Sequence, residues 1–174
     1  MSKQRKILSG MMAILGLCFT LALQAKQSGI NAAPTAVDAS QAMNVPFDDL
    51  KWQAIVPEMG KDSPEISVLR VDPKTQATQL LIRIPAAMHV PTHWHSANET
   101  HTMIKGTAVF EHGGNRHELG PGGFNYIPAK TQHQAWCSQG SVVFITVDGA
   151  WDVNWVNGPP VKKDLGQVAP AASK

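Results

Sequence analysis

Three side chains that commonly bind metal ions stand close together in the middle of the chain. His93 and His95 are two residues apart, and Glu99 follows four residues later. Side chains two apart on an extended strand point to the same side, so one sheet face can carry both imidazoles. Imidazole nitrogens and a carboxylate that converge from one face suit a first-row divalent metal ion. Paired histidines also occur on exposed strands, so this spacing taken alone leaves a metal site and a solvated surface both open.

The pattern continues beyond these residues with regularly placed glycines and a proline. Six residues separate Glu99 from Gly106, and 15 more precede Gly122. Five residues then lead to Pro128, and four more lead to His133. This stretch resembles the two conserved motifs of the cupin superfamily, G-x5-H-x-H-x3-4-E-x6-G and G-x5-P-x-G-x2-H-x3-N. The motif sequence is similar to those of small bacterial single-domain cupins, which are related to the cupin domain of anti-sigma factors and to some aromatic-cleaving dioxygenases.

The resemblance implies an RmlC-like jelly roll, an all-β barrel that holds one metal ion. The ligands it implies are His93, His95 and Glu99 from the first motif and His133 from the second. The ion would be a divalent transition metal (Fe, Mn, Ni, Cu or Zn), since all of these accept nitrogen and oxygen ligands. A barrel that has lost its metal but kept these residues is the alternative. The motifs depart from the superfamily pattern at three positions that supply no ligand: Ala87, Lys130 and Cys137.

Several residues near the predicted site invite a functional and a structural interpretation. His101 lies two residues after Glu99 and shares its face of the strand, so it can act as a catalytic acid or base. It can equally be an interior histidine that is hydrogen-bonded to a neighbouring strand. Packing roles are expected for four further residues: Met103 and Phe124 inside the barrel, and Trp151 and Trp155 in the core or a subunit interface.

The remaining sequence must form the strands that position these side chains. Short apolar runs alternate with turn residues such as DPKT, HGGN and GPGG, and no run keeps helical spacing over three turns. Many short, evenly spaced strands indicate an all-β sandwich or barrel, here a single cupin domain at 46–157. The expected strands are 66–71, 78–84, 99–105, 108–111, 124–127, 133–136, 142–147 and 152–156.

The two ends of the chain have a different composition. Lys3, Arg5 and Lys6 precede an uncharged, mostly apolar run at 7–23, and this order is typical of a secretory signal peptide cleaved after Ala25. An uncleaved anchor and a lipoprotein modified at Cys18 are the alternatives. Residues 26–45 are expected to be a flexible leader, and residues 158–174, which contain three prolines, a disordered tail. The protein is therefore expected to be exported to the periplasm, with no stable membrane association after cleavage.

The charge and the cysteine content argue against a nucleic-acid-binding protein and against a domain held together by internal disulfides. Residues 26–174 carry 12 Lys and Arg against 13 Asp and Glu, a net charge near −1, and contain no basic stripe for nucleic acid. Cys137 is the only cysteine after residue 25, so this part of the chain has no internal disulfide. It lies four residues after His133 and is expected to point the same way. A buried, inert thiol is expected there, with a reactive thiol as the alternative.

Two functions of different class follow from these features. The first is a metal-dependent enzyme, an oxygenase on a small enolic or aromatic compound, or an isomerase or lyase that uses the same scaffold. The second is a non-catalytic periplasmic module that binds or senses a ligand or a metal. A storage-type structural barrel fits one short domain with four intact ligands less well. In each case the partner is a small molecule, and the resemblance to cupins implies pairing as a homodimer.

Overall fold

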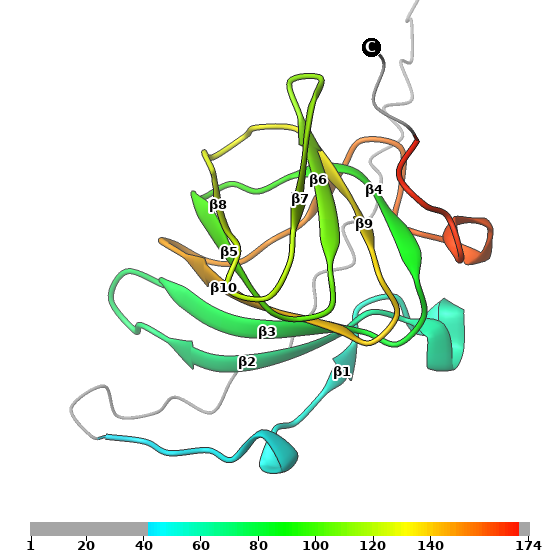
Figure 1. Ribbon diagram of the computed structural model, residues 1–174. Coiled ribbons are helices and arrows are strands. Elements are labelled where there is room, and N and C mark those ends of the chain that lie inside the picture. Colours follow the sequence, from blue (N-terminus) through cyan, green and yellow to red (C-terminus); the bar gives the residue numbers. More distant parts are fainter. Residues whose placement is uncertain (1–41, 171–174) are drawn as a thin grey trace, which may run out of the picture.

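The computed structural model describes residues 42–170, which form two antiparallel sheets packed against each other (Figure 1). This all-β architecture is consistent with the expected jelly roll. The larger sheet contains, in spatial order, β1 (Gln53–Ala54), β2 (Glu65–Val71), β3 (Thr78–Ile84), β10 (Ser141–Val147), β5 (Glu99–Lys105) and β8 (Phe124–Ile127). The smaller sheet contains β11 (Asn154–Trp155), β4 (Met88–Trp94), β9 (His133–Cys137), β6 (Ala108–His112) and β7 (Asn115–Leu119).

Helical structure is limited to three short 3-10 segments. These are η1 (Phe47–Asp49), η2 (Pro57–Asp62) and η3 (Lys162–Asp164), and no α-helix occurs between residues 42 and 170. Each of the eight expected strands overlaps an observed strand, whereas β1, β4 and β7 were not anticipated. The prediction of many short strands and little helix is therefore confirmed.

Strand β4 escaped prediction because Pro91 stands in its middle. Proline has no backbone N–H to donate to a sheet ladder, and it usually occurs at edges or bulges. The pairing of β4 with β9 does show a register shift, which falls between Val90 and His93. The irregularity leaves the Pro91 carbonyl free to accept a hydrogen bond from His93 Nδ1 at 2.7 Å. The proline thus helps to orient a site histidine.

The alternation of side chains along the strands separates the core from the surface. In β3, Thr78, Leu80 and Ile84 are buried, while Gln79 between them is exposed. Inward residues of the two sheets form three buried apolar clusters, centred on Met88, on Leu80 and on Phe110. The core therefore lies between the sheets, where the inward faces meet.

The segment after Gly158 corrects the prediction of a disordered tail. Pro160 is fully buried, η3 follows it, and Leu165 forms an antiparallel bridge with Met88 at the start of β4. The Gly166 N–H also donates to the Ala87 carbonyl at 2.7 Å. Prolines and small residues made this segment look unstructured, but it covers the free edge of β4 and adds Leu165 to the apolar cluster around Met88.

The predicted signal peptide and most of the predicted leader, together residues 1–41, lie outside the described residues, as do residues 171–174. Between residues 42 and 170, no helix has the length and apolar character needed to cross a membrane.

Candidate metal centre

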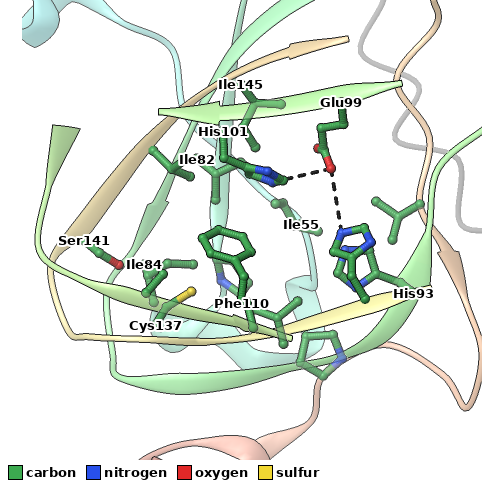
Figure 2. Close-up of a pocket in the computed structure, with 18 of the residues that line it drawn as sticks. Ile55, Ile82, Ile84, His93, Glu99, His101, Phe110, Cys137, Ser141 and Ile145 are labelled. Carbon is green, nitrogen blue, oxygen red and sulfur yellow. Dashed lines mark ion pairs between the residues drawn. The ribbon is translucent and has the colours of Figure 1, made fainter. Parts of the chain in front are cut away.

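The sequence-predicted residues come together from both sheets. Strand β4 ends with His93 and Trp94, and His95 follows immediately. Strand β9 begins with His133, which pairs directly with His93 in the smaller sheet. Glu99 is the first residue of β5 in the larger sheet, so its carboxylate faces these histidines across the interior (Figure 2). The turn before β9 is fastened to this region, because the N–H of Lys130, a residue with φ of 63°, donates to the His95 carbonyl at 2.8 Å.

Distances in the cluster are those of groups that share one centre. Glu99 Oε2 lies 3.1 Å from His95 Nε2 and 3.7 Å from His133 Nε2. The rings of His93 and His133 are 4.2 Å apart between centroids. One nitrogen from each of His93, His95 and His133 lies within 4.8 Å of the others, and all three residues are buried. Three histidines in this arrangement can hold a metal ion.

Backbone carbonyls set the tautomer of the three imidazoles. The Nδ1 atoms of His93 and His133 lie 2.7 Å from the Pro91 carbonyl and 3.0 Å from the Thr131 carbonyl. The Nδ1 of His95 contacts the Asp152 carbonyl. A carbonyl oxygen can only accept, so Nδ1 carries the proton in each ring, and in a neutral ring Nε2 carries a lone pair. Hydrogen bonds from the Nδ1 atoms to carbonyl oxygens are the usual way in which a protein orients histidines toward a metal ion.

Electrostatics within the cluster favour a bound cation. Burial lowers the pKa of His93 to about 3 and that of His133 to about 4, so both rings are neutral at pH 7. Burial acts to raise the pKa of Glu99, but the His101 and His95 imidazoles outweigh burial and lower this pKa to about 2. Burial likewise disfavours a charged His95, yet its contact with the Glu99 carboxylate raises the pKa of His95 above the usual value.

Two buried polar atoms in the centre support the same conclusion. Within residues 42–170, Glu99 Oε2 and His133 Nε2 are inaccessible to solvent and receive no hydrogen bond while the neighbouring imidazoles are neutral, although His95 Nε2 and His101 Nε2 lie 3.1 Å and 3.4 Å from Glu99 Oε2. A buried carboxylate oxygen and an imidazole lone pair without donors are costly, because each loses its interaction with water. A divalent cation would satisfy both atoms at once. The residues present therefore fit a metal ion in type, in orientation and in charge.

His101 lies beside this cluster and contacts it directly. Its Nε2 is 3.4 Å from Glu99 Oε2, and its Nδ1 is 2.7 Å from the amide oxygen of Asn125 on β8. The position of His101 is compatible with both roles considered for it: the ring is hydrogen-bonded to a neighbouring strand, and it also faces the centre, where a catalytic acid or base would lie. Asn125 was missed because the alternation along β8 was assigned one residue out of phase. Phe124, expected inside the barrel, is 60% exposed, whereas Asn125 and Ile127 point inward.

A cavity with a volume of about 90 Å³ adjoins the centre and continues between the sheets. His93, His95, Glu99, His101 and His133 form its polar part, and apolar residues such as Ile82, Phe110 and Ile145 line most of the remainder (Figure 2). Cys137 lines it too, as its spacing from His133 predicted. Burial raises the pKa of this thiol to about 12, which agrees with an inert cysteine.

Trp151 and Trp155, which were expected in the core or in a subunit interface, lie beside the histidine cluster and line the cavity. Trp155 packs against His93 with ring centroids 5.0 Å apart, and Trp151 stacks near His95 at 6.3 Å. Both residues line the cavity. Their spacing in the sequence could not reveal this position, because it depends on how the loop after β10 returns to the centre. That loop is held by Asp152, whose carboxylate accepts from the Ser96 N–H at 2.8 Å.

Comparisons with solved structures place this fold among the cupins. An RmlC-like cupin from Shewanella frigidimarina NCIMB 400 has a TM-score of 0.51 and 13% identity, covering 63% of this chain and 93% of that chain. A putative acetylacetone dioxygenase from Methylibium petroleiphilum PM1 has a TM-score of 0.54 and 16% identity, covering 70% of this chain and 87% of that chain. The polyketide cyclase RemF from Streptomyces resistomycificus has a TM-score of 0.53 and 20% identity, covering 71% of this chain and 89% of that chain.

At these identities the likeness shows the fold alone. No curated protein sequence matches the chain. A family model does match, and it covers residues 40–152, which include the whole histidine cluster. Fold, motif residues and family match agree, and the chain belongs to the ChrR cupin-like domain family.

Proposed function

We propose that this protein is an exported metal-binding cupin that acts as a metal-dependent enzyme, of oxygenase type, on a small organic substrate. The observation that carries the proposal is the convergence of three buried imidazoles and the Glu99 carboxylate at one end of a largely apolar cavity. His93, His95, Glu99 and His133 would hold one divalent transition metal ion. When bound, such an ion supplies Lewis-acid or redox chemistry to a substrate oxygen.

The chain's own residues would bind and orient the substrate. The apolar walls exclude water and favour a small, mostly apolar molecule. His101 is held at Nδ1 by Asn125, which leaves Nε2 directed toward the centre, where it can accept or donate a proton. The fold neighbours whose names include a dioxygenase and a cyclase support small-molecule chemistry in general but not one reaction.

The experiment that tests the proposal is metal content per chain, measured by mass spectrometry on full-length protein purified without chelator. About one ion per wild-type chain is expected. In Glu99→Gln, which keeps the shape but removes the charge, metal affinity should fall by about 100-fold or more, since even the loss of an outer-shell partner costs roughly 10–100-fold. Glu118→Gln, which alters an exposed carboxylate on β7, serves as the matched control and should retain the metal.

The identity of the ion separates the two functional classes. A redox-active metal together with substrate-dependent oxygen uptake would support the oxygenase. Zinc with saturable ligand binding and no turnover would support a binding or sensing module instead. A folded wild-type chain that takes up no metal even after reconstitution would contradict the metal-dependent enzyme and would leave a non-catalytic ligand-binding barrel.

Export and pairing as a homodimer belong to the same proposal. Export is supported by the charged and apolar segments of residues 3–23. Pairing is supported by three large side chains that are about half exposed on the neighbouring strands β5 and β8, namely Ile104, Phe124 and Tyr126. Native mass spectrometry of the protein recovered from a periplasmic extract should give a dimer of chains that begin at Lys26. Chains that begin at Met1 would contradict cleavage, and a monomer would contradict pairing.

A further inference from the structure

The cavity runs away from the metal centre along the inner face of the larger sheet. In the pairing of β5 with β10, Glu99 stands opposite Val147, His101 opposite Ile145, and Met103 opposite Val143. Side chains at alternate positions of β10 share one face, so Ser141 is the next inward residue after Val143. Ser141 and Ile145 are four positions apart, which corresponds to about 13 Å along a strand.

The smaller sheet forms the opposite wall of the cavity, and its lining also becomes apolar with distance from the metal centre. Along the pairing of β4 with β9, His93 stands opposite His133, and Met88 stands opposite Cys137. Cys137 lies four residues from His133 and is therefore also about 13 Å along the strand from the centre. Figure 2 shows Ser141, Cys137 and Ile84 together, away from Glu99 and His101. The cavity thus has a polar end at the metal centre and a long apolar middle.

Ser141 places one polar atom at the far, apolar end. The residue is only 2% exposed and lines the cavity. Its Oγ is buried, and within residues 42–170 no group forms a hydrogen bond with it. A hydroxyl in this state is unfavourable in the protein alone, because burial removes its bonds to water. The backbone N–H of Ser141 bonds to the Ser138 carbonyl, so the local turn does not require the side chain.

The chain passes very close to Ser141 at Gly106. A Cβ atom on Gly106 would lie 2.7 Å from Ser141 Cβ and 2.8 Å from Ser138 Oγ, and the residue has φ of 73°. Only glycine fits such a contact in this conformation without a shift of the neighbours. The motif glycine therefore allows the chain at residue 106 to pass directly beside Ser141.

At the metal end, a second unpartnered group lines the same cavity. The indole Nε1 of Trp151 is buried and has no hydrogen-bond partner within the described residues. This N–H can only donate, so it would favour an acceptor oxygen on a bound molecule. The ring lies beside His95, which places this preference next to the metal centre.

We propose that the cavity binds an elongated molecule with an apolar body, an acceptor oxygen group such as a carboxylate at the metal end, and a hydroxyl or carbonyl that bonds Ser141 Oγ. This inference rests on the proposed function and names its substrate class. A terminal hydroxyl would satisfy the Ser141 side chain, whereas a methyl group would leave that side chain without a partner. The quantity to measure is therefore the ratio of the affinities of two ligands that differ only in having a terminal hydroxyl or a methyl group.

The test uses straight-chain carboxylic acids of four to eight carbons, each paired with the same acid bearing a terminal hydroxyl. Their affinities for the metal-loaded full chain are measured by calorimetry. At the best-fitting length, the wild type should bind the hydroxy acid about five- to tenfold more tightly than the plain acid. Ser141→Ala should lose or reverse this preference, while Ser67→Ala, an equally buried serine on β2, should keep it.

Ser141→Ala should also fold normally, because it removes a hydroxyl that forms no hydrogen bond with any residue from 42 to 170, and its melting temperature should be unchanged or higher. Equal binding of the two acids by the wild type, a preference that persists in Ser141→Ala, or no binding at any length would overturn the inference. Metal content is measured in the same samples. A wild type without metal would overturn the proposed function and this inference with it, whereas metal without a hydroxyl preference would overturn the inference alone.

Discussion

The double variant His95→Ala/His133→Ala is expected to contain no bound metal when it is purified without chelator beside the wild-type chain. Both Nε2 atoms lie within 3.7 Å of Glu99 Oε2, and the change removes two of the three imidazoles that could hold the ion. If each ligand contributes at least as much as an outer-shell partner can, the affinity falls by about 10⁴-fold or more. Metal per chain, measured by mass spectrometry, gives the result directly.

A second double variant provides the matched control. His112 and His117 flank the turn between β6 and β7, with ring centroids 6.0 Å apart, and neither residue lines the cavity. His112→Ala/His117→Ala should retain about one ion per chain. Circular dichroism of the metal-free forms should show that both variants remain folded. If the control loses the metal, or if the first variant keeps a full equivalent, the metal centre lies elsewhere than we propose.

Stability should fall at alkaline pH because of Cys137. Burial raises the pKa of its thiol to about 12, whereas in the unfolded chain it titrates near ~8.5. Between these two values the unfolded chain loses the proton and the folded chain keeps it, so the unfolded state binds fewer protons. The free energy of unfolding then decreases as pH rises, by about 1.4 kcal/mol per pH unit from this group. Below about pH 8 the thiol contributes no pH dependence.

Urea unfolding at pH 8, 9, 10 and 11 measures this effect in the wild type and in Cys137→Ala. The variant keeps every other titrating group, so the difference between the two pH slopes belongs to the thiol. The wild-type slope should be steeper by about 1.4 kcal/mol per unit over pH 9–11. Parallel curves would mean that the thiol ionises equally well in the folded protein, and Cys137 would then be an accessible, reactive cysteine.

The sequence determined the identity of the central residues because strand geometry is local. Residues two or four apart on a strand face the same side, so the spacing of His93 and His95 and of His133 and Cys137 already predicted a shared interior. The motif glycines and Pro128 marked turns for equally local reasons. The resemblance to cupins then joined the two halves of the cluster, which lie about 35 residues apart in the chain.

Other features depended on contacts between segments that are distant in the chain. The interior position of Asn125 follows from the pairing of β8 with β5, and a shift of one residue would have turned Phe124 inward instead. The ordered segment from 158 to 170 contains a buried residue, Pro160, and Leu165 pairs with Met88, yet its composition resembles that of a linker. No local pattern distinguishes a proline-rich tail that finds an open sheet edge from one that does not.

The character of the cavity was likewise decided only by the tertiary structure. Ser141 is an ordinary turn-flanking serine in the sequence, and Trp151 belongs to a loop. These two residues become significant because the fold places both in the lining of one cavity, Trp151 beside His95 and Ser141 away from the metal centre, and because their polar atoms are buried without hydrogen-bond partners among residues 42–170. Side-chain type and spacing along a strand determine which groups can share a face. Which faces meet, and which polar atoms are left without partners between them, is determined by strand register and long-range packing.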